Sequence, residues 1–143
     1  MMEFLLYLNP QSIEIYNLIS QKVKFSENAP ICYKSDVYGN YNSVSNLITI
    51  CTGSIKKSYA TKKYTNETFL HEVVHYAQSC KSRNRTLVPF GINPKAMVLD
   101  SEKNITLKEI IAYDYRLRQI DHESLWMSEK PEKVKHAVLK YCF

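Results

Sequence analysis

One ten-residue segment, FLHEVVHYAQ at residues 69–78, constrains the fold of this chain more than any other feature. Its apolar residues recur at spacings of three, four, seven and eight, which is the pattern of a helix with one buried face. His71 and His75 are four residues apart, so their imidazoles lie one above the other on a neighbouring face. The segment therefore predicts a helix that packs on a core and presents two histidines on one side.

The same segment reads His71-Glu72-x-x-His75, a pattern that indicates a particular chemistry. Two imidazole nitrogens one helical turn apart can bind one tetrahedral Zn2+ ion through bonds of about 2.0–2.1 Å. Glu72 would lie beside the metal without binding it, where a general base can take a proton from water. We interpret His71 and His75 as metal ligands and Glu72 as the catalytic base. The alternative is a helix with two ordinary histidines.

Composition indicates one domain over residues 1–143, long enough to bury a core, with 45% hydrophobic and 23% charged residues. The net charge is +5, but the basic residues are scattered and form no reading helix, so we expect no nucleic acid partner. No segment approaches the ~20 apolar residues of a membrane span, and the apolar run Phe4–Leu8 lacks the basic start of a signal peptide. We therefore expect no membrane association and a cytoplasmic location.

Four cysteines are widely spaced and include no C-x-x-C pair, so they are weak candidates for metal ligands. They are Cys32, Cys51, Cys80 and Cys142. Buried thiols and one or two disulfides are both compatible with this spacing. Without an export signal, we expect reduced thiols.

Turn and helix-breaking residues divide the rest of the chain into an N-terminal half with two strands and a helical C-terminal half. The expected helices are 10–25, 94–103, 105–120 and 132–141, the expected strands 29–33 and 44–51, and the expected loops 35–43, 52–63 and 83–93. Thr65 or Asn66 is the expected cap of the motif helix. These elements predict an α+β domain with a small sheet.

The strand that directly precedes the motif helix is predicted to bind the substrate. Its central residues are Leu47, Ile48, Thr49 and Ile50. In a domain of this size we expect it at the edge of the sheet, where its free backbone groups can pair with an extended peptide.

A zinc site needs a third protein ligand, and Gln78 and Lys81 occupy the positions where the metzincin pattern requires Gly and His. Glu109 is our candidate, because at 100° per residue it shares a helix face with apolar residues and its charge needs a counter-ion. Two alternatives remain open. Thr106-x-x-Glu109 also matches a capping box, and Glu102 is a second candidate ligand.

The HExxH helix, the Ile-Thr-Ile strand before it and the later Glu-x-x-Ala-Tyr segment together resemble the gluzincin branch of the zincin metallopeptidases. More narrowly, they resemble small uncharacterised proteins of cyanobacteria and their phages, in which the motif continues as H-x-x-Q followed by Cys. Gln78 and Cys80 fit that form, and the likeness covers roughly residues 44–143. The resemblance implies a minimal zincin-like fold with zinc bound by His71, His75 and Glu109.

The resemblance also implies peptide-bond hydrolysis, with Glu72 activating the water and a peptide or protein as substrate. Better-known gluzincins often have an acidic residue four positions after the ligand Glu, where this chain has Tyr113. Tyr113, Tyr115 and His122 are the candidates for the oxyanion donor. The alternative function is a zinc-stabilised binding module on the same scaffold with little or no turnover.

Overall fold

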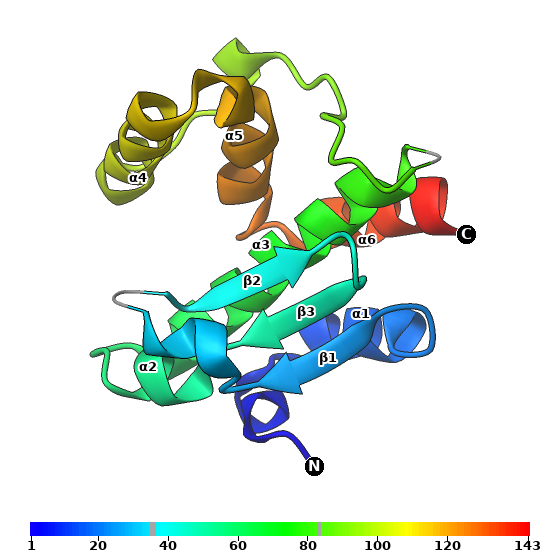
Figure 1. Ribbon diagram of the computed structural model, residues 1–143, viewed down its shortest axis with the longest axis vertical. Helices are drawn as coiled ribbons and strands as arrows, with labels where there is room; N and C mark the ends of the chain where they lie inside the picture. The colour runs from blue at the N-terminus through cyan, green and yellow to red at the C-terminus, as the bar shows by residue number, and fades with distance from the viewer. Residues whose placement is uncertain (35–36, 83) are drawn as a thin grey trace.

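The long helix α3 (Thr61–Cys80) is the centre of the fold, and the sheet, α5 and α6 all pack against it (Figure 1). The computed structural model describes residues 1–34, 37–82 and 84–143, so the predictions for Ser35, Asp36 and Arg83 lie outside the described residues. The other elements, in chain order, are α1 (Pro10–Ile19), β1 (Lys24–Glu27), β2 (Gly39–Asn42), β3 (Leu47–Ile50), α2 (Thr52–Lys56), α4 (Ser101–Tyr113), α5 (Arg118–Met127) and α6 (Pro131–Cys142). Short 3-10 helices lie at Glu3–Tyr7, Pro30–Tyr33, Pro94–Ala96 and Tyr115–Leu117. This is an α+β fold with a small sheet and a helical C-terminal half, as the sequence predicts.

The sheet has the order β1-β3-β2, with β1 parallel and β2 antiparallel to β3. The prediction that Leu47–Ile50 forms the edge of the sheet is therefore wrong, because β3 is its central strand. The error arises because neither of the two strands that pair with β3 is predicted as a strand. The sequence places Lys24–Glu27 partly in a helix and Gly39–Asn42 in a loop, yet both pair with β3 along its whole length. The edge strand β2 packs its backbone against α3, whereas the edge strand β1 reaches α3 through Phe25, which stacks on Phe69.

Two predicted elements near the N-terminus differ for identifiable reasons. The first helix ends at Ile19 and not at Phe25, because the chain turns at residues 20–23 and enters β1. Phe25 then stacks on Tyr16, with ring centroids 4.9 Å apart. The predicted strand 29–33 is instead a 3-10 helix that starts at Pro30, whose fixed φ suits a first helical turn and whose nitrogen cannot donate to a strand ladder.

Helix α3 begins at Thr61, so the predicted cap at Thr65 or Asn66 is wrong. The Asn66 side chain is buried and joins α3 to the N-terminal segment. Its Oδ1 accepts a hydrogen bond from the Asn9 backbone N–H (2.9 Å), and its Nδ2 donates to the Tyr7 carbonyl (2.9 Å). Asn66 therefore does not cap α3 but forms hydrogen bonds with backbone groups of Tyr7 and Asn9, which lie beside the helix.

The C-terminal half is divided into more, shorter helical segments than predicted, whereas the helix expected at 132–141 is confirmed as α6. The helix expected at 94–103 is only a 3-10 turn, and α4 starts later, capped by Asp100, which accepts from the Lys103 N–H (2.8 Å). The helix expected at 105–120 is interrupted at Asp114, which is extended (φ −152°, ψ 105°) and caps the next turn. Residues before and after this break therefore belong to separate helices. Of the residues described, none lies in a helix long and apolar enough to span a bilayer.

All four cysteines are bonded, so the prediction of reduced thiols is wrong. One disulfide joins Cys32 to Cys51, at the end of β3, and the other joins Cys80 to Cys142. The second bond fastens the C-terminal end of α3 to the C-terminal end of α6. Neither pairing could be deduced from spacing, because four cysteines allow three connectivities.

We expect the two disulfides to stabilise the fold unequally. The chain-entropy model assigns roughly 4 kcal/mol to the Cys80–Cys142 bond, which spans 62 residues, and roughly 3 kcal/mol to the Cys32–Cys51 bond, which spans 19. The double variant Cys80→Ala/Cys142→Ala should thus lose more free energy of unfolding than Cys32→Ala/Cys51→Ala. Chemical denaturation without reductant measures both. Variants that both unfold at the wild-type midpoint would contradict this expectation.

Candidate metal centre

Three side chains of α3 converge beside a cleft of about 660 Å³ that lies between β2, α3 and α4. Ligand atoms of His71, Glu72 and His75 all lie within 4.8 Å of one another. Glu72 and His75 are buried and His71 is half-buried. The two imidazole rings are 4.8 Å apart between centroids, with their planes at 80°. The helix therefore brings together the three motif residues that the sequence singles out.

A fourth side chain, Asp121 of α5, also reaches this cluster, and sequence reasoning missed it. Its Oδ1 lies 3.5 Å from Nε2 of His75, and both side chains are largely buried. Two ligand atoms of one tetrahedral zinc ion, with bonds of about 2.0–2.2 Å, are about 3.3–3.6 Å apart, so this distance fits a shared ion. One turn further along α5, Oγ of Ser124 lies 3.4 Å from Nε2 of His71. Helix α5 thus faces both imidazoles.

Gln78 fixes the orientation of the His75 ring. The amide nitrogen Nε2 of Gln78 donates to the Ile120 carbonyl (3.0 Å), which can only accept. The amide oxygen of Gln78 must then face His75, and it lies 2.8 Å from Nδ1. His75 must therefore carry a hydrogen on Nδ1, so Nε2 of the neutral ring presents its lone pair toward Asp121.

This orientation of His75 favours a positive charge, either a proton or a metal ion, between Nε2 and Asp121. A lone pair and a carboxylate 3.5 Å apart repel each other unless a positive charge lies between them. Burial by itself would lower the pKa of His75, but the hydrogen bond to Asp121 and the charges of Glu72 and Asp121 outweigh burial and raise it. A proton can occupy this position. A zinc ion suits it equally, because two imidazoles and a carboxylate are ligands that zinc prefers.

The other two residues of the motif have pKa values that suit metal binding and base catalysis. Burial, then the nearby His75 and Lys103, lower the pKa of His71 well below its usual value, so the ring is neutral and able to bind a metal. Burial raises the pKa of Glu72 to about 7, with Asp121 adding to the shift and His75 opposing it. A carboxyl group with a pKa near neutrality is well suited to act as a general base.

Glu109, the third ligand predicted from the sequence, is not brought to this cluster. It is exposed on α4, whose inner face packs through Leu107 and Ile111. Glu109 is two residues from each of them, which is roughly 200° around the helix. The prediction placed it on a buried face because it treated 105–120 as one helix. The capping-box alternative is also wrong, because α4 begins at Ser101 and Thr106 lies inside it.

Glu102 and the candidate oxyanion donors lie apart from the three clustered residues as well. Glu102 is exposed where it lines the cleft, and it accepts from the Tyr64 hydroxyl at 3.4 Å. Tyr113 and Tyr115 are mostly exposed, and neither lines the cleft. His122 is buried, with Nε2 2.8 Å from the Met97 carbonyl. None of the three predicted donors therefore faces the motif residues.

A cationic side chain does lie in the cleft. Nζ of Lys103 is 2.8 Å from Oε1 of Glu67 and 3.0 Å from Oε1 of Glu129, and it donates to Oγ of Ser128 (3.0 Å). Two carboxylates hold one ammonium group, so this cluster joins α3, α4 and the turn after α5. Its hydrogen bonds leave Lys103 little freedom to move toward a bound molecule.

Strand β2 lies close against α3 at Gly39, next to the predicted base. A Cβ atom at residue 39 would lie 2.6 Å from Cγ2 of Thr68, 3.1 Å from the Thr49 carbonyl oxygen and 3.2 Å from Oε2 of Glu72. The lack of a side chain is thus what lets the edge strand lie against the motif helix.

We expect Gly39→Ala to destabilise the fold and displace Glu72. The new methyl group meets a β-branched side chain and a backbone carbonyl, neither of which can withdraw easily, so overpacking should cost about 1–3 kcal/mol. Gly53→Ala is the matched control, because its Cβ would meet only the Asn28 side chain, with Oδ1 at 3.5 Å, an ordinary contact. Thermal unfolding of both variants measures the difference. Equal melting temperatures would contradict the close packing of β2 on α3.

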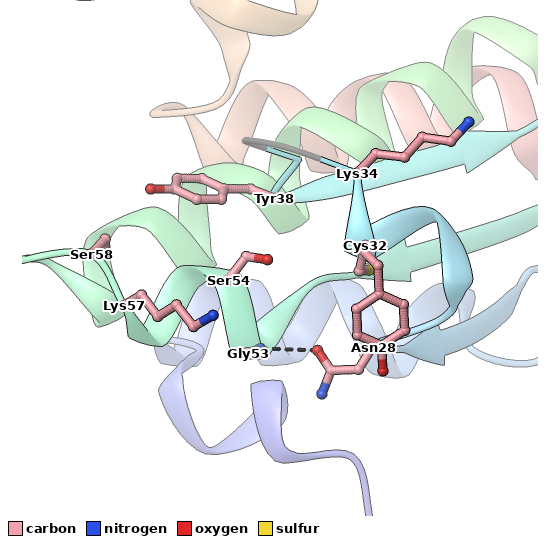
Figure 2. A pocket seen from close by; sticks show the side chains of 9 residues that line it. Asn28, Cys32, Lys34, Tyr38, Gly53, Ser54, Lys57 and Ser58 are labelled. Atoms are coloured by element: carbon pink, nitrogen blue, oxygen red, sulfur yellow. Dashed lines mark hydrogen bonds between the residues drawn. The ribbon is translucent and has the colours of Figure 1, made fainter.

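A second hollow, of about 650 Å³, lies beside α2 and the 3-10 helix at Pro30–Tyr33 (Figure 2). The hydrogen bond drawn there joins the Gly53 N–H to Oδ1 of Asn28 at 2.9 Å. Lysine, serine, tyrosine and asparagine side chains line this hollow, and its described lining contains no carboxylate and no imidazole. The described part of this hollow therefore lacks the carboxylate and imidazole groups that line the cleft beside α3.

Comparison with known proteins places the chain in one family without assigning an activity. A family model described as a domain of unknown function, DUF8637, matches residues 4–143. No curated protein and no solved structure matches the chain.

Proposed function

We propose that this chain, which belongs to the DUF8637 family of domains of unknown function, hydrolyses peptide bonds with one zinc ion. In this proposal His71, His75 and Asp121 are the zinc ligands. The observation that carries it is the distance of 3.5 Å between Nε2 of His75 and the Asp121 carboxylate, which fits two ligands of one zinc ion, beside a second imidazole on the same helix. Asp121 replaces Glu109, because its carboxylate lies 3.5 Å from Nε2 of His75, whereas Glu109 is exposed on α4.

The residues of the cleft would divide the work of hydrolysis. When bound, zinc would polarise the scissile carbonyl and lower the pKa of water. Glu72, whose pKa is about 7, would accept the proton of the attacking water and later transfer it to the leaving amine. Gln78 would keep Nε2 of His75 directed at the metal. The burial of Glu72 and His75 excludes bulk water and so strengthens these electrostatic interactions.

Strand β2 is the structural candidate for binding the substrate. It is an edge strand, its first residue lies against Glu72, and it borders the cleft. An extended peptide or protein segment can pair with the free backbone groups of such a strand. The role assigned to Leu47–Ile50 therefore passes to Gly39–Asn42, since both sides of β3 are occupied.

One observation favours the alternative of a zinc-stabilised binding module. Lys103, a cation of the cleft whose charge acts on His71, is already held by Glu67 and Glu129. A donor engaged in this way is a poor stabiliser of a developing oxyanion. In this alternative, the metal would stabilise the packing of α5 on α3, and the cleft would bind a peptide without cleaving it.

Metal analysis combined with an activity assay tests the proposal. Protein purified without chelators should contain one zinc ion per chain, and His71→Ala should lose the metal and melt at a lower temperature. Cleavage of unfolded casein should require the metal and return when zinc is restored after chelation. A protein that binds no stoichiometric zinc would refute both the peptidase and the binding module. One that binds zinc but leaves casein and a broad peptide library intact would favour the module.

We also infer that the chain functions in an oxidising compartment and not in the cytoplasm that the sequence predicts. Two disulfides in one domain of this size are typical of oxidising surroundings and rare in cytosolic proteins. Free-thiol counts on protein isolated with rapid alkylation from its native source would decide between the two locations.

A further inference from the structure

We propose that Glu123 is a positioning residue that sets the tautomer of His75 through Gln78 and ties the segment 90–92 to the metal centre. The consequence for zinc rests on the proposed function, whereas the tautomer itself does not. Glu123 lies on α5 two residues after Asp121 and is fully buried.

Glu123 is surrounded by hydrogen-bond donors. Both of its carboxylate oxygens accept hydrogen bonds, from the backbone N–H groups of Phe90 (2.8 Å), Gly91 (2.9 Å) and Ile92 (3.1 Å) and from Nε2 of Gln78 (3.1 Å) and Gln119 (3.0 Å). All five partners donate, so the group is fitted to accept hydrogen bonds as a carboxylate. A buried carboxylate is costly unless it is hydrogen-bonded in this way.

One of these hydrogen bonds continues to the metal centre. Nε2 of Gln78 is shared between Glu123 and the Ile120 carbonyl, and both of these groups can only accept. The amide of Gln78 therefore cannot flip without facing its oxygen toward two other oxygens. That constraint keeps the Gln78 oxygen on Nδ1 of His75 and leaves Nε2 of the imidazole free to bind a metal.

The same carboxylate holds the chain that follows α3. Phe90 stacks on Tyr141 of α6 with ring centroids 5.3 Å apart, and Gly91 adopts a positive φ of 90° that other residues rarely adopt. Glu123 bonds to the backbone at both residues. The conformation of segment 90–92 and the orientation of His75 thus depend on one buried group.

Glu123→Gln is the decisive variant, because it keeps the shape and replaces one accepting oxygen with a donating NH2 group. Whichever way the new amide turns, its NH2 group faces N–H donors. If it faces Gln78, the Gln78 amide is pushed to flip and the hydrogen of His75 moves from Nδ1 to Nε2. We expect zinc affinity to fall by about 10–100-fold, the range for loss of an outer-shell partner.

Two measurements on the purified full chain test this. Nitrogen-15 NMR of the histidine rings, in metal-free protein at a pH where His75 is neutral, reports the tautomer. Competition with a chelating dye reports zinc affinity. Gln119→Met is the matched control: it removes one of the five bonds to Glu123 but leaves Gln78 in place, so it should change neither readout.

A second variant covers the case in which Glu123→Gln does not fold. Gln78→Met leaves four of the five bonds to Glu123 intact and removes the bonds of Gln78 to His75 and to the Ile120 carbonyl, so it should give a mixture of tautomers and the same loss of zinc affinity. The proposal is overturned if wild-type His75 carries its hydrogen on Nε2, or if folded Glu123→Gln or folded Gln78→Met keeps both the Nδ1–H tautomer and full zinc affinity. A wild-type protein that binds no zinc, but shows the expected tautomer and its loss in the folded variants, would refute the proposed function and leave the positioning role standing.

Discussion

Asp121→Ala should remove zinc from the protein almost completely. The variant deletes one of the three proposed ligands and also leaves Nε2 of His75 without its anionic neighbour at 3.5 Å. The loss of zinc affinity should therefore exceed the ~10–100-fold that an outer-shell partner contributes. Elemental analysis after dialysis against a weak chelator, followed by dye competition, measures it. Because metal binding is linked to folding, the melting temperature should no longer rise when zinc is added.

Glu109→Ala is the control that gives this result its meaning. It also removes one carboxylate, from the neighbouring helix, but Glu109 is exposed and outside the cluster, so zinc affinity and stability should stay at wild-type values. The reverse outcome, with zinc retained in Asp121→Ala and lost in Glu109→Ala, would restore the ligand set predicted from the sequence. Loss of zinc in Glu102→Ala would point instead to the second candidate of the sequence analysis.

The motif residues could be predicted from the sequence because their geometry is local. A four-residue spacing on one helix fixes where His71 and His75 point, whatever the rest of the chain does. Asp121 is different, because its position depends on how α5 crosses α3. It depends also on the break at Asp114, which lets α5 take a direction different from that of α4. Residues 119–123 (QIDHE) contain no pattern that marks one polar residue as a ligand. Only tertiary packing distinguishes them.

The sheet illustrates the same limit. β3 is predictable because LITI has strong strand propensity, but its place in the sheet is not. Its partner β2 reads GNYN, which is typical of turns, and forms a strand because Gly39 fits against α3 and its backbone pairs with β3. β1 is equally short. β1 and β2 have four residues each, and they form strands because they pair with β3 and not because their residues favour strands. Such strands cannot be located from the sequence, so the sequence cannot show which strand lies at the edge of the sheet.

Glu72→Gln should separate catalysis from metal binding. The substitution keeps the size of the side chain and leaves all three proposed ligands untouched, so zinc content should remain at one per chain. Cleavage of casein should fall by at least ~100-fold, because the group that accepts the proton is gone. Steady-state assays at matched zinc occupancy measure the loss. If wild type and Glu72→Gln both bind zinc and both fail to cleave a broad peptide library, the binding module becomes the better account of this chain.

The same variant should also raise the stability of the metal-free protein at alkaline pH. In the fold the pKa of Glu72 is raised to about 7 from its ordinary 4.5, so between these values the folded protein holds a proton that the unfolded chain has released. Stability contributed by this group is therefore present below pH 4.5 and is lost as the pH rises through 7, to a total of roughly 3 kcal/mol.

The amide of the Glu72→Gln variant cannot ionise, so this protein should match wild type near pH 5 and unfold at a higher denaturant concentration at pH 8. Urea titrations of chelator-treated protein at the two pH values test this, with Glu109→Gln as an exposed control that should show no difference. Identical midpoints for wild type and Glu72→Gln at pH 8 would mean that Glu72 is not the buried, destabilising carboxylate that a base beside a metal site should be.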